Sequence, residues 1–87
     1  MKKIERIDQA INFARSIASD ILIYNKEQVY LGLREDDLYE RISPAIEEGR
    51  RLYMERVDLG GQRTSEHFER ALTDVLVRKG MAGLERE

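Results

Sequence analysis

The chain has 87 residues and therefore forms one domain at most. Its 15 basic and 17 acidic residues give a net charge of −2, which argues against a general nucleic-acid binder because such domains are normally basic. Cysteine is absent, which excludes a disulfide framework, a thiolate metal site and a cysteine nucleophile.

The first third of the chain carries a seven-residue apolar repeat, which predicts a long helix over about residues 5–33. The repeat alternates steps of three and four through Ile4, Ile7, Ile11, Ala14, Ala18, Ile21 and Asn25. A second row lies beside it at Ala10, Ile17, Tyr24 and Leu31. Asn25 either fixes the register of paired helices as a buried amide or is solvated near the helix end.

After Asp20 the same helix becomes apolar on every side, and such a helix is normally buried on every side. Because the two shorter helices offer limited cover, we expect two copies of the chain to form a homodimer through this segment. The other interpretation is an ordinary intramolecular core. The expected interface residues are Ile17, Ile21, Leu22, Ile23, Tyr24, Asn25, Val29 and Tyr30.

Apolar residues at helical spacing predict a second helix over about residues 37–57, with Asp36 or Asp37 as its N-cap. Pro44 either kinks this helix or opens a new one. Because the apolar stripe continues in phase across Pro44, we favour one kinked helix. Gly49 lies within the stripe, and either the close approach of another helix backbone or chance explains it.

The last predicted helix covers about residues 65–79, where five apolar residues recur at amphipathic spacing: Phe68, Ala71, Leu72, Val75 and Leu76. Gly80 suits the position just after a helix end, so we expect residues 81–87 to form a flexible tail. The expected fold is a single all-α domain over residues 1–80. We expect a three-helix, hairpin-like bundle with a long N-terminal helix.

Chemical motifs are sparse. His67 is the only histidine, and Glu66 and Glu69 lie close to it in sequence, which suggests a metal-dependent helical-bundle enzyme as one alternative. A di-iron bundle needs Glu-x-x-His on each of two helices, whereas Thr64 stands three residues before His67. A serine triad would need the same histidine, and the sequence has no Gly-x-Ser-x-Gly turn. We therefore expect no catalytic residue, metal ligand or cofactor.

A candidate basic patch for an acidic partner or a phosphate consists of Arg50, Arg51, Arg56 and Arg63. The other interpretation is a solvated charged face, on which Glu47 and Arg51 form an i,i+4 pair. The first alternative function, nucleic-acid binding by a dimer, would use Arg50, Arg51 and Arg56 together with Lys26; the metal-dependent enzyme is the second alternative. Its affinity would fall steeply with salt concentration.

Three segments resemble an uncharacterised bacterial helical domain found at the ends of larger regulatory or signalling proteins. They are ARSIASDILIYN (residues 14–25), EGRRLY (48–53) and RV (56–57), and the resemblance covers roughly residues 13–76. It implies a module used for association, and it transfers no catalytic or binding residue. Pro44 departs from the uninterrupted second helix that the resemblance implies.

The N-terminal residues are charged too early and too often for a signal peptide. The longest apolar run, from Ile21 to Tyr24, is far shorter than the roughly 20 residues that span a bilayer. We therefore expect a soluble, cytoplasmic, bacterial protein without membrane contact. The predicted function is a non-catalytic protein–protein interaction or oligomerisation module, an adaptor or regulatory subunit whose partner is a second copy or an unknown protein.

Overall fold

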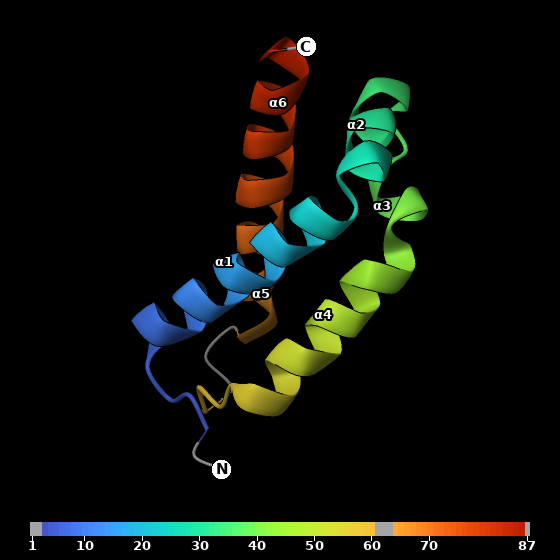
Figure 1. Cartoon of the computed structure of the whole chain (residues 1–87). Helices are drawn as coiled ribbons and strands as arrows, with labels where there is room; N and C mark the ends of the chain where they lie inside the picture. Colours follow the sequence, from blue (N-terminus) through green and yellow to red (C-terminus); the bar gives the residue numbers. More distant parts are fainter. Residues whose placement is uncertain (1–2, 61–63, 87) are drawn as a thin grey trace.

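A computed structural model describes residues 3–60 and 64–86, and every regular element in these ranges is a helix. The prediction of an all-helical fold is therefore confirmed. The elements follow in the order α1 (Ile7–Tyr24), α2 (Lys26–Glu35), α3 (Leu38–Arg41), α4 (Ser43–Arg56), α5 (Thr64–Leu72), the π-helical segment η1 (Thr73–Lys79) and α6 (Gly80–Arg86) (Figure 1).

The predicted first helix is divided at Asn25, which leaves helical geometry with φ −122° and ψ 27°. Its side-chain amide donates a hydrogen bond to the Ile21 carbonyl at 2.9 Å, and its backbone N–H donates to the same oxygen at 3.0 Å. The Asn25 carbonyl in turn accepts from the Val29 N–H at 2.8 Å. Half-buried Asn25 thus ends α1 and begins the turn into α2.

The predicted second helix is also divided. α3 ends at Arg41, and α4 begins anew with Pro44 in its first turn. Proline fits there because the N–H groups of the first turn have no hydrogen-bond acceptor within the helix, so the N–H that proline lacks is not missed. The single kinked helix that we favoured is therefore wrong. Asp36 ends α2 in the left-handed conformation with φ 61°. Asp37 stands at the N-cap of α3, but its carboxylate accepts from Arg41 Nε at 2.6 Å instead of capping a backbone N–H.

The C-terminal helix is longer than predicted. α5, η1 and α6 follow without a gap and form one rod (Figure 1), so the chain is helical to Arg86, where the sequence predicted a flexible tail; the last residue lies outside the described ranges. Gly80 keeps helical angles, φ −62° and ψ −45°. A Cβ added there would lie 2.6 Å from Leu33 Cδ1, and one at Gly83 would lie 2.8 Å from Tyr30 Cζ. Both glycines therefore let α6 pack closely against α2.

One hydrophobic core joins α1, α2, α4 and the C-terminal rod. Its largest fully buried side chains are Tyr53, Phe68, Leu72, Leu76, Val29 and Val75. The Tyr53 ring stacks on Phe13, with centroids 6.4 Å apart, and meets Phe68 at 5.2 Å. A Cβ added to Gly49 would lie 2.8 Å from Ile17 Cγ2 and 3.2 Å from Ile21 Cδ1, so this glycine makes room for side chains of α1 and not for a helix backbone.

The segment before α1 is tied to the end of α4. Ile4 and Val57 form an isolated parallel bridge, in which the Ile4 N–H donates to the Arg56 carbonyl and the Asp58 N–H donates to the Ile4 carbonyl, each at 2.8 Å. α1 and α4 consequently run side by side in opposite directions (Figure 1). Within the described ranges, no helix combines the length and apolar character needed to cross a membrane.

Candidate functional site

The structure divides the predicted interface residues by burial. Ile17, Ile21 and Val29 are buried in the chain's own core, Leu22, Asn25 and Tyr30 are half-buried, and Ile23 and Tyr24 are exposed by 67% and 84%. Val29 needs no second copy to cover it, contrary to our expectation, because α6 packs against α2. The part of the predicted interface that remains open to a partner is therefore the end of α1.

A hollow of about 300 Å³ lies between the end of α1 and α4 and is here called the α1–α4 groove. From α1, buried Ile21 lines its interior and Tyr24 lines its edge, while Asp20 places a carboxylate beside them. From α4, Leu52 is 41% exposed and Glu48 adds a second carboxylate. The groove thus has an apolar interior, exposed apolar edges and an acidic end.

The exposed face of α4 beside this groove carries charges of both signs. Glu48, Leu52 and Arg56 follow at i, i+4 and i+8 and therefore lie along one face of the helix. At 1.5 Å per residue, the two charged residues are about 12 Å apart, with Leu52 midway between them. Among the described residues, neither Glu48 nor Arg56 has an ion-pair partner.

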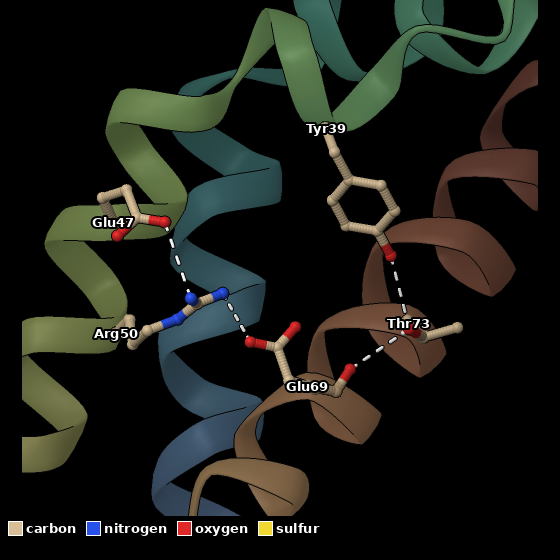
Figure 2. A network of polar contacts seen from close by, with 5 residues as sticks. All are labelled: Tyr39, Glu47, Arg50, Glu69 and Thr73. Carbon is tan, nitrogen blue, oxygen red and sulfur yellow. Dashed lines mark hydrogen bonds and ion pairs between the residues drawn. The ribbon is translucent and has the colours of Figure 1, made fainter.

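Arg50, the first residue of the predicted basic patch, has its charge satisfied inside the molecule. Its Nη1 lies 3.6 Å from Glu47 Oε1, and its Nη2 forms an ion pair with Glu69 (Figure 2). Beside this pair, the Tyr39 hydroxyl lies 3.3 Å from Thr73 Oγ1, which donates to the Glu69 carbonyl at 3.1 Å. Arg50 Nε is buried without a hydrogen-bond partner. These contacts link α3 and α4 to the C-terminal rod.

The structure does not bring the other predicted basic residues to Arg50. Arg51 and Arg56 are exposed. Within the described ranges, neither forms an ion pair with a residue of α5. Arg63 lies outside the described residues. Lys26 is on α2, with its ammonium 5.8 Å from the centre of the Tyr30 ring. The nucleic-acid alternative therefore has no assembled basic surface that includes Arg50.

The only histidine is half-buried near the start of α5. His67 lines a hollow of about 370 Å³ with Ser65, Glu66, Glu69 and Arg70. Among residues 3–60 and 64–86, no group of three or more histidine, aspartate or glutamate side chains is close enough to hold a metal ion. The metal-dependent alternative therefore has no assembled ligand set in this part of the chain.

Tyr53 has the one ionisable side chain whose pKa is clearly shifted in the described residues. It is fully buried, and its hydroxyl donates a hydrogen bond to the Thr64 carbonyl at 2.7 Å. Loss of hydration on burial raises the pKa of this hydroxyl above its ordinary value of 10.0. The group joins α4 to the start of α5 and is inaccessible to a substrate, so its role is structural.

Replacing this tyrosine, Tyr53→Phe, is expected to cost about 1 kcal/mol of unfolding free energy at neutral pH, because one buried hydrogen bond is lost. Below pH 10.0 the hydroxyl is protonated in the folded and unfolded chains alike. Above it, the unfolded chain releases the proton first, which favours unfolding and makes the stability of the parent chain fall.

The difference in unfolding free energy between the parent chain and Tyr53→Phe should therefore shrink as the pH rises above 10.0. Urea unfolding of both chains, followed by circular dichroism at neutral and alkaline pH, measures this difference. A difference that stays constant with pH would contradict the assigned cause.

Sequence reasoning did not identify Asp20, Glu48 and Leu52 as site residues. Leu52 belongs to the apolar stripe of α4, but helical spacing alone does not distinguish the buried edge of such a stripe from the exposed one. The i, i+4, i+8 pattern of acid, leucine and arginine was a usable signal. Comparisons with protein families, with curated proteins and with solved structures found no match for this chain.

Proposed function

We propose that this chain is a small, non-catalytic protein–protein interaction module, an adaptor or regulatory subunit in the bacterial cytoplasm, that associates through the α1–α4 groove. The observation that carries the proposal is the exposure of Tyr24 and Leu52, by 84% and 41%, where they line an apolar hollow. Exposed apolar surface rimmed by polar groups is typical of protein interaction sites.

The residue types on this surface support the same function. Tyr24 combines an apolar ring with a polar hydroxyl, which suits an interface that is partly wet. Leu52 lies across the groove from Tyr24, on a different helix, so a partner would contact α1 and α4 together. The resemblance to bacterial helical domains of regulatory and signalling proteins implies association as well.

Site-specific photo-crosslinking tests the proposal. A photoreactive phenylalanine analogue is placed at Leu52 in one variant and at Met54 in the other, and both are irradiated in cells that express the chain. The two positions are similarly exposed, by 41% and 45%, but two residues turn about 200° around a helix, so they lie on different faces of α4.

We expect a covalent adduct of defined mass at position 52 and none at position 54. The adduct should disappear when Tyr24→Ser is added, because this substitution removes the facing edge of the groove. Equal adduct formation at both positions, or none at either, would refute the proposed function.

A further inference from the structure

The geometry points to a second copy of this chain as the occupant of the surface, with the two α4 helices antiparallel across a two-fold axis at Leu52. This inference rests on the proposed function, because it assumes that the α1–α4 surface binds a protein. It adds the identity of the partner and the residues that meet.

The charge pattern of α4 is self-complementary. In a two-fold contact, residue i of one copy meets residue j of the other, and j meets i. Glu48 and Arg56 lie one helical turn before and after Leu52, respectively. When two such helices cross antiparallel at Leu52, each Glu48 faces the Arg56 of the other copy. Two equivalent ion pairs then flank one apolar contact.

A partner of a single charge fits this face less well. A basic helix would complement Glu48 and Asp20 at one end of the groove, but it would repel Arg56 about 12 Å away along α4. An acidic helix would have the opposite conflict. Because neither Glu48 nor Arg56 is paired within the described residues, a second copy satisfies both charges with no change of fold.

The shape of the chain agrees with this partner. The chain measures 41 × 22 × 20 Å, so its elongated form leaves a long side available for a copy.

Sedimentation of the purified full chain over a range of concentrations tests the inference. The parent chain should show twice the mass of one chain. Arg56→Glu and Glu48→Arg should each weaken self-association about tenfold, because two attractions become two repulsions. The double variant that carries both reversals should recover most of the parent's affinity.

The matched control is Arg78→Glu, a charge reversal at an exposed arginine of η1, which should leave the dimer unchanged. Circular dichroism checks that every variant is folded. A parent chain that is monomeric at all concentrations, or a double variant as weak as the single ones, would overturn the inference. In that case an adduct at position 52 in cells would still support an interaction module with another partner, whereas its absence would refute both.

Discussion

Replacing Phe68 with alanine is expected to lower the free energy of unfolding by about 3–5 kcal/mol, the usual cost of removing a fully buried phenylalanine ring. Phe68 is 1% exposed, and its ring meets Tyr53 at a centroid distance of 5.2 Å. The Arg50 guanidinium carbon lies 6.0 Å from the same ring. Loss of the Phe68 ring would leave a cavity where α4 and α5 meet.

Small domains have only about 5–15 kcal/mol of stability in total, so the Phe68→Ala variant should be close to its unfolding limit at physiological temperature. Urea unfolding followed by far-ultraviolet circular dichroism measures the change. Phe13→Ala is the matched control, because Phe13 stacks on the same Tyr53 ring but is only half-buried. It should cost clearly less, and equal losses would contradict the assignment of Phe68 to the centre of the core.

Periodicity predicted the helical class, because the structure buries the middle of the first stripe and the whole stripe of the last predicted helix, which α5 and η1 form. Ile7, near the start of the first stripe, is 42% exposed. Ala10, Ala14, Ile17, Ala18 and Ile21 are all buried, as are the five stripe residues of the last predicted helix. Where a helix is held in place mainly by the burial of one face, the spacing of its apolar residues is enough to identify it.

Helix ends were predicted less well because they depend on local hydrogen bonds and on distant packing. Asn25 stops α1 by donating its side-chain amide to the Ile21 carbonyl, a competition with the helix that an apolar repeat does not reveal. Gly80 and Gly83 are glycines, and glycine is common just after the end of a helix. They are helical here because α6 packs closely on Leu33 and Tyr30 of α2.

The candidate site was predicted in part. The segment after Asp20 was recognised as too apolar for one face of a helix, and the single chain leaves Ile23 and Tyr24 exposed; that a partner covers them stays a prediction. Which of its sides stays open could not be derived, because α6, absent from the prediction, covers the side of Val29. The α4 side of the groove depends on the antiparallel placement of α1 and α4, which is a property of the fold rather than of either helix.

The turn between α2 and α3 should be intolerant of any side chain at Gly32. The Gly32 carbonyl accepts the N–H groups of Asp36 and Asp37, the latter at 3.0 Å, which folds α3 back onto α2. A Cβ at Gly32 would lie 2.6 Å from the Leu38 Cα and 3.2 Å from its Cβ. Because Cα belongs to the backbone, it cannot rotate away, and α3 would have to shift.

Gly32→Ala is therefore expected to lower the unfolding free energy by about 2 kcal/mol, because a backbone clash lies at the upper end of the range of about 1–3 kcal/mol for overpacking and the helix preference of alanine returns about 1 kcal/mol. Gly80→Ala is the control. Its added Cβ would also lie 2.6 Å from a neighbour, but that atom is Leu33 Cδ1, the end of a flexible side chain, so the loss should stay below about 1 kcal/mol. Urea unfolding of both variants compares them directly. Equal losses would show that the backbone of α3 yields as readily as a leucine side chain, and would remove the reason for glycine at position 32.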